Sequence, residues 1–227
     1  MDTQQAFYAW SESQQRFRTI LLGFNNHQEA VSLFLQQHAM LHSAALTGAD
    51  WTFADAVVGG LSEKQLRVIP PRCEHSVAWL LWHVARTEDA AMNLALAGTD
   101  QVLHRDGWLP ELGVAHLDIG TAMSDADVAA LSESIDLPAL LAYRLAVGKR
   151  TREVVQQTPV DVLKQPVEAE RIERVKAGGI VIEAAHDVAD FWGRHIKASL
   201  LLGAATRHLM THLNEARRMR PKLKRIG

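Results

Sequence analysis

The chain is poor in cysteine, with Cys73 the only one among 227 residues. A single cysteine excludes a disulfide within the chain, and it excludes a zinc site built from two or more thiolates. Cys73 follows Pro70 and Pro71, with no neighbour in the sequence that would activate a thiolate. We therefore favour a loop cysteine without a chemical role over a nucleophile.

An excess of charge of one sign is also missing. The 24 Lys and Arg residues nearly balance the 26 Asp and Glu residues, giving a formal net charge of −2. This balance does not favour nucleic acid or an anionic membrane as a partner. No stretch approaches ~18 consecutive apolar residues, and the N-terminal segment lacks the basic and apolar regions of a signal peptide. We expect no membrane span and a cytoplasmic protein.

Helical periodicity dominates what is present. Residues 28–46 place apolar side chains and two histidines at intervals of three and four, namely Val31, Phe34, Leu35, His38, Leu41, His42 and Ala45. Such spacing is typical of an amphipathic helix. The same reasoning predicts four long helices, at about 28–47, 74–98, 137–157 and 187–220. We expect the last one to bend near Gly203 and to end before Pro221.

The segments between these helices are less regular. A short helix is expected within 51–66 and another at 124–135, whereas 99–123 lacks clear periodicity. Residues 179–183 fit a short strand or a loop. No repeat, low-complexity tract or linker divides the chain. We therefore predict one all-α domain over residues 1–227, a four-helix bundle with additional short helices and a long inserted loop region at 99–135.

Three of the 11 histidines combine a chemical use with a defined geometry. His83 lies in the apolar run 77-VAWLLWHVA-85, on the buried face of its helix. His208 and His212 are four residues apart, so they share one helical face one turn apart. Three protein ligands and an open position are typical of a catalytic metal centre.

Spacing alone does not decide between a metal site and core histidines, because chance gives about 0.5 such pairs in this chain. Buried imidazoles need partners for both nitrogens. Taken alone, His208 and His212 leave both interpretations open, and His83 favours the core. The second pair, His38 and His42, favours hydrogen-bonded core residues. A role in supporting the metal ligands, or beside a substrate, is the alternative for this pair.

Two further residues are candidates near the histidines. Glu215 follows His212 by three positions, so it could accept a hydrogen bond from a ligand histidine or act as a general base. Pairing with a neighbouring arginine at the surface is the alternative. Trp79 could wall a substrate cavity, although core packing is favoured. The basic C-terminal tail at 217–227 favours interaction with the helix end over nucleic-acid binding.

The segments 61-LSEKQLRVIPPRCEHSVAWLLWHVARTEDAAMNLALAG-98 and 207-RHLMTHLNEARRMR-220 resemble the DinB-like superfamily of metal-dependent four-helix bundles, also called DinB/YfiT-like. The shared pattern is an aromatic-rich second helix with an internal histidine, followed by the HxxxH pair on the fourth helix. These motifs cover about a quarter of the chain, and the helix order extends the likeness over most of 28–220. The resemblance implies that His83, His208 and His212 bind the metal.

The resemblance also implies a divalent ion, usually nickel or zinc, and a tendency to form homodimers. It implies a thiol-dependent S-transferase or isomerase that uses a low-molecular-weight thiol such as bacillithiol or mycothiol and a small-molecule substrate. The first alternative is a non-catalytic, stress-related helical bundle in which the metal or the histidines are structural. The second is a DNA-associated stress protein that binds through its basic tail.

Overall fold

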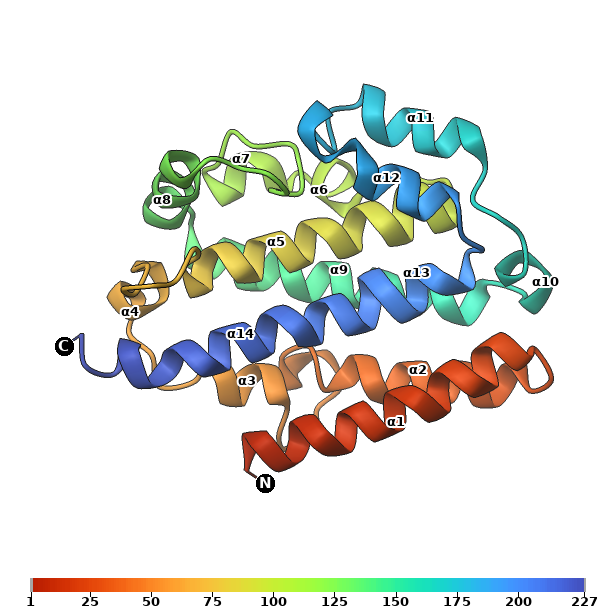
Figure 1. The fold of residues 1–227 in the computed structure, drawn as a ribbon, viewed down its shortest axis with the longest axis horizontal. Helices are drawn as coiled ribbons and strands as arrows, with labels where there is room; N and C mark the ends of the chain where they lie inside the picture. Colours follow the sequence, from red (N-terminus) through yellow and green to blue (C-terminus); the bar gives the residue numbers. More distant parts are fainter. Residues whose placement is uncertain (1, 227) are drawn as a thin grey trace.

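The computed structural model describes residues 2–226 and shows an all-helical fold (Figure 1). No strand occurs in this range, apart from one isolated bridge between Pro166 and Ile196. The helices are α1 (Thr3–Gly23), α2 (His27–Ala39), α3 (Phe53–Val58), α4 (Glu63–Arg67), α5 (Val77–Asp89), α6 (Val102–Arg105), α7 (Trp108–Leu112), α8 (Asp125–Ser134), α9 (Leu137–Gln157), α10 (Val160–Leu163), α11 (Ala169–Ala177), α12 (His186–Gly193), α13 (Ala198–Leu202) and α14 (His208–Leu223).

Four long helical segments form the bundle and run along its long axis (Figure 1). These segments are α2, α5, α9 and the pair α13–α14. Two π-helical segments extend them: η2 (Ala90–Ala97) continues α5, and η4 (Gly203–Arg207) joins α13 to α14. Helix α1 packs against α2 at the outer edge of the bundle. The described helices thus confirm the predicted all-α class and the helices expected near 74–98 and 137–157.

Helix α5 is the central element, because every residue from Val77 to Leu96 is buried. Its start is fixed locally, since the Ser76 hydroxyl accepts a hydrogen bond from the backbone N–H of Trp79 at 3.0 Å. A helix buried on all sides needs cover on each of them. Helices α6, α7 and α8 lie together on the side of α5 that faces away from α1 and α2, so the predicted insertion at 99–135 supplies this cover (Figure 1).

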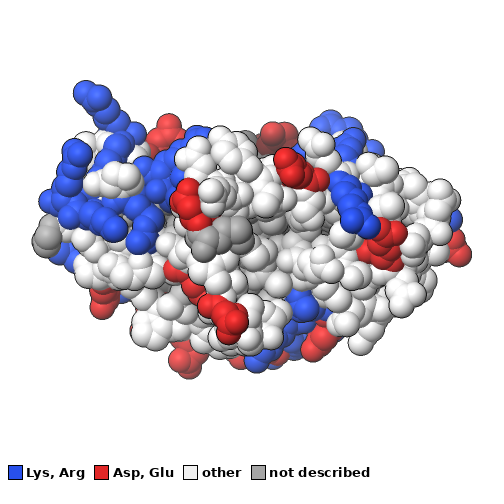
Figure 2. All heavy atoms as spheres, turned by 90° about the horizontal axis from the view of Figure 1, so that it is seen from below, with Lys and Arg blue, Asp and Glu red and all other residues white. Residues whose placement is uncertain are grey.

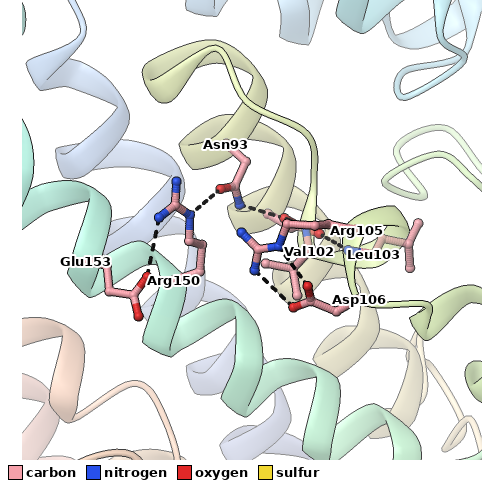
Figure 3. A network of polar contacts seen from close by, with 8 residues as sticks. Asn93, Val102, Leu103, Arg105, Asp106, Arg150 and Glu153 are labelled. Atoms are coloured by element: carbon pink, nitrogen blue, oxygen red, sulfur yellow. Dashed lines mark hydrogen bonds and ion pairs between the residues drawn. The ribbon is translucent and has the colours of Figure 1, made fainter.

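The buried carboxylate of Asp89 anchors the inserted segment to the bundle. It accepts hydrogen bonds from the backbone N–H groups of Val102 and Leu103, at 2.9 and 3.0 Å, and from the Tyr143 hydroxyl at 2.6 Å. In Figure 3, Val102 and Leu103 lie on one side of Asn93 and Arg150 of α9 lies on the other. Asp89 thus caps the start of α6, where a helix has unpaired N–H groups.

The helix predicted at about 28–47 is shorter than expected, and the prediction missed α1 entirely. Helix α2 ends at Ala39 because the next carbonyl groups find partners outside the helix. The Met40 oxygen accepts from Ala54 N at 3.2 Å, and the Leu41 oxygen accepts from the Arg144 guanidinium at 3.2 Å. A short 3-10 turn, η1 (Ala44–Leu46), follows.

The C-terminal half also departs from the sequence prediction. The helix predicted at 187–220 is interrupted at 194–197, and the π-helical turn begins at the predicted bend, Gly203. The prediction that this helix ends before Pro221 is wrong, since α14 continues to Leu223 with Pro221 in its last turn. Residues 169–177 form α11, and residues 179–183 contain no strand.

Lys and Arg side chains gather at the end of the molecule where the chain ends (Figure 2). Several of them bind backbone oxygens rather than solvent alone. Arg220 donates to the Val57 and Gly59 oxygens, and Lys222 donates to the Pro71 oxygen at 3.0 Å. The basic tail therefore fastens the end of α14 to the end of α3 and to the loops that follow α3 and α4. No helix within residues 2–226 has the length and apolarity needed to cross a membrane.

Candidate metal centre

The fold brings His83, His208 and His212 together. His83 lies in the middle of α5, and the other two occupy the first two turns of α14. One ring nitrogen from each residue lies within 4.8 Å of the others, and the Nε2 atoms of His83 and His208 are 3.1 Å apart. The spacing on α14 and the apolar position of His83 thus place three imidazoles at one point.

The partners of the outer nitrogens fix the protonation of two rings. His83 donates its Nδ1–H to the Ile119 carbonyl, and His212 donates its Nδ1–H to the Glu215 carboxylate at 2.9 Å. Carbonyl and carboxylate oxygens can only accept, so in the neutral form of either ring the proton is on Nδ1 and Nε2 offers a lone pair. Lone pairs that converge on one point suit a cation.

The distance of 3.1 Å between the Nε2 atoms of His83 and His208 is also compatible with two ligands of one metal ion. With metal–nitrogen bonds of about 2.0–2.1 Å, neighbouring ligand atoms are roughly 3.3 Å apart in a tetrahedral site and roughly 2.9 Å apart in an octahedral one. The observed distance lies between these values. His208 differs from the other two, because its buried Nδ1 has no hydrogen-bond partner within residues 2–226.

Burial keeps the rings of His83 and His208 neutral. Removal from water, followed by repulsion from His212, lowers the pKa of His83 to about 3, and the hydrogen bond to Ile119 only partly offsets this. Burial, with repulsion from His83 and His212, also lowers the pKa of His208 well below its usual value. Neutral imidazoles are the form that binds a metal, so protons compete little for this site near neutral pH.

Glu215 connects two histidines at the edge of the site. Its carboxylate accepts from His212 at 2.9 Å and from Nδ1 of His75 at 3.2 Å, so histidines occupy both of its oxygens. Partial burial raises the pKa of Glu215, but the hydrogen bonds from His212 and His75 outweigh this effect and lower the pKa to about 2. Such a carboxylate orients a ligand ring better than it accepts a proton.

Trp79 lies between two of these histidines. Its ring stacks on His75 with centroids 4.0 Å apart and on His83 with centroids 4.7 Å apart, both at an interplanar angle of 12°. The three side chains sit four residues apart on one face, although His75 itself precedes the helix. Trp79 therefore holds the His83 ring in place from behind.

A cavity of about 470 Å³ opens beside the three histidines. Its walls come from α5, the segment at 119–121, α12, η4 and the start of α14. The lining residues are His83, Thr87, Ile119, Thr121, Val188, Phe191, Trp192, Gly203, Ala204, Arg207, His208, Thr211 and His212. A ligand in this cavity would reach the histidine nitrogens directly.

His38 and His42 lie elsewhere, in a second buried cluster that does not line this cavity. His38 Nε2 is 2.8 Å from one oxygen of Glu88, and His42 Nε2 is 3.0 Å from the other. Glu88 is 0 % exposed and points away from His83, as expected for a residue five positions further along a helix. Burial, partly offset by attraction to Glu88, lowers the pKa of His42 to about 4.

Sequence reasoning missed three partners of these histidines: His75, Glu88 and Ile119. His75 precedes Trp79 by four residues, and this spacing could have predicted that His75 shares a face with Trp79 and His83. Glu88 is an acid within an otherwise buried helix, so it needs a partner of its own. Ile119 gave no signal, because a backbone carbonyl in an irregular segment carries none.

The chain was compared with known proteins. A family model described as the DinB superfamily matches residues 46–216, a range that includes both the His83 helix and the HxxxH pair. No curated protein matches the chain. Because the match covers most of the residues, the chain belongs to the DinB superfamily.

Proposed function

We propose that the protein is a metal-dependent enzyme whose ion is held by His83, His208 and His212. One observation carries this proposal: His83 and His212, whose Nδ1 atoms contact the Ile119 and Glu215 oxygens, converge through Nε2 with a third imidazole at the wall of a cavity. A closed structural site would fill its fourth position with protein. Three ligands beside an open cavity are typical of catalysis. Nickel and zinc are the ions that imidazole ligands and the family resemblance favour.

We further propose that the reaction is a thiol-dependent transfer or isomerisation. A divalent ion at this site would lower the pKa of a bound thiol or water and so supply a nucleophile at neutral pH. The chain's own residues position the components. Ile119 and Glu215 orient two ligand rings, and Trp79 supports the first of them. The apolar walls around Phe191 and Trp192 exclude water from an electrophilic substrate.

The metal centre is tested by metal content. Untagged protein purified without chelators should contain close to one nickel or zinc ion per chain by mass spectrometry. His83→Ala and His212→Ala should lose it, while His104→Ala should retain it, because His104 is an exposed histidine outside the site. An absence of metal from the wild type, even after reconstitution, would refute the enzyme proposal and leave a bundle with core histidines.

The thiol version has its own test. Nickel-loaded protein should develop a sulfur-to-metal charge-transfer band when a low-molecular-weight thiol is added, and His212→Ala should not. A metal-loaded protein whose spectrum no thiol changes would contradict this version. If His212→Ala also lowered the melting temperature and no reaction were found, the structural role of the metal would replace it.

A further inference from the structure

The side chains of residues 2–226 that line the cavity beside the histidines include one positive charge and no negative charge. Within the part of the chain that the structure describes, no Asp or Glu lines it, and Arg207 is the one Lys or Arg that does. The remaining walls are apolar or carry hydroxyl groups. A divalent ion on three neutral histidines would add to this positive charge. The cavity therefore favours an anion over a cation or a neutral molecule.

Arg207 is free to bind such an anion. Its side chain is exposed, and its guanidinium makes no hydrogen bond or ion pair with any residue from 2 to 226. Two arginines further along, in α14, are occupied: Arg217 donates to Asn214 at 2.9 Å, and Arg220 donates to the Val57 and Gly59 oxygens. Arg218, the third arginine of α14, does not line this cavity. A planar guanidinium with open donors binds oxyanions in a bidentate manner.

The backbone fixes where Arg207 stands relative to the metal ligands. It is the last residue of the π-helical turn η4 and directly precedes His208. Its carbonyl also accepts a hydrogen bond from the Thr211 hydroxyl at 2.9 Å. π-Helical turns are often found at functional sites, where they change which side chains face a cavity. The six residues from Arg207 to His212 thus carry the unpaired guanidinium and two candidate metal ligands.

Thr87 of α5 lines the same cavity and also carries a polar group without a partner among the described residues. Thr87 is 4 % exposed, and its hydroxyl has no hydrogen-bond partner within residues 2–226. It follows His83 by one helical turn on α5. A buried hydroxyl without a partner is costly, so a ligand atom that bonds to it would be favoured.

We propose that this cavity binds a small ligand with an oxyanion group, which Arg207 pairs at the rim while another atom of the same ligand reaches the metal. Phe191, 46 % exposed, offers apolar contact, and rotation of the Thr87 side chain would turn its unpaired hydroxyl toward the ligand. This inference rests on the proposed function, because it assumes the metal at the three histidines. It adds the charge class of the ligand and names Arg207 as the residue that selects it.

The test uses cobalt-substituted protein, whose visible spectrum reports ligands that enter the coordination sphere. Two matched pairs of thiols serve as probes: 3-mercaptopropionate against 3-mercapto-1-propanol, and 6-mercaptohexanoate against 6-mercapto-1-hexanol. In each pair the chains are alike and only one end group differs. We expect at least one acid to bind about five- to tenfold more tightly than its alcohol.

Variants then assign this preference to one residue. Arg207→Gln should reduce the preference to less than about twofold, with cobalt content and alcohol affinity unchanged. Arg225→Gln removes the same charge from an exposed position outside the cavity and should keep the preference. Equal binding of acids and alcohols in the wild type, or a preference that survives Arg207→Gln, would overturn the inference alone. A protein that binds no cobalt, or no thiol of any kind, would overturn the proposed function with it.

Discussion

The buried cluster of Glu88, His38 and His42 gives the sharpest prediction on stability. Both oxygens of Glu88 accept from a histidine, at 2.8 and 3.0 Å, and the carboxylate is 0 % exposed. Burial raises the pKa of Glu88, but attraction to the two histidines and their hydrogen bonds outweigh this and keep its pKa below the usual range. The buried Arg144 lies close enough to feel this charge. Glu88→Gln removes the charge with almost no change in shape.

The loss of stability in Glu88→Gln can be estimated from the groups that the variant leaves without a partner. An amide presents one acceptor and one donor, so its donor meets a second donor at one histidine, and the charge of Arg144 loses its compensation. Breaking a buried charge pair from one side costs about 3–5 kcal/mol. A histidine can change its tautomer and recover one hydrogen bond, so we expect a loss of about 3 kcal/mol. For a domain of this size, that loss lowers the melting temperature by roughly 6–12 °C.

The assay is urea unfolding followed by circular dichroism, together with metal content. Glu153→Gln is the matched control, because Glu153 pairs with Arg150 at the surface and should change stability by less than about 0.5 kcal/mol. The metal content of Glu88→Gln should equal that of the wild type, since Glu88 faces away from His83. A loss below about 1 kcal/mol would refute the reasoning that Glu88 is a buried anion.

Three further outcomes are expected. Glu215→Gln should weaken metal binding about 10- to 100-fold in a chelator competition, because it removes the anion that orients His212; unchanged affinity would contradict that role. Gly148→Ala should lower the melting temperature, since its new Cβ would lie 2.8 Å from Nδ1 of His42; an unchanged melt would show that this ring can move aside. Between pH 6.5 and 4, His42 alone should lower the free energy of unfolding by roughly 3 kcal/mol, because burial holds its pKa at about 4 and only the unfolded chain gains that proton; His83 and His208, whose pKa values burial also lowers, should add to this loss. A flat pH profile from urea titrations would argue against this.

Local signals explain which helices could be predicted. Helices α5 and α9 begin where Ser76 and Asp136 accept hydrogen bonds from backbone N–H groups three residues later, and both carry long apolar patterns. Helix α1 has the same kind of cap at Asp2 but a sparse buried stripe, consisting of Ala6, Trp10, Phe17 and Leu21. Because most other residues of α1 are polar, its apolar periodicity was too weak to predict a helix. Pro221 stays helical because the loss of one hydrogen bond in the last turn costs less than it would in the middle of a helix.

Some residues of the candidate site could likewise be predicted from the sequence, and others could not. The three imidazoles could be predicted because helical periodicity fixes which side chains share a face. Their supporting partners could not, since contacts such as that between His83 and Ile119 join residues 36 positions apart through a segment without periodicity. The positions of Arg207 and Thr87 on one cavity depend on how α5 and η4 pack, and a single sequence does not encode that packing in a readable pattern.

The contacts that anchor the inserted segment would couple its stability to metal binding at His83. Asp89 holds the start of the segment, the Arg86 guanidinium holds the Leu117 oxygen at 2.6 Å, and Ile119 then accepts from His83. Any event that releases the segment would therefore remove a support from the metal ligand, and loss of the ion would in turn loosen the segment. Thermodynamic linkage makes the two effects equal in free energy. A metal held by His83 would therefore stabilise the inserted segment, and a ligand entering beside Ile119 would act on both.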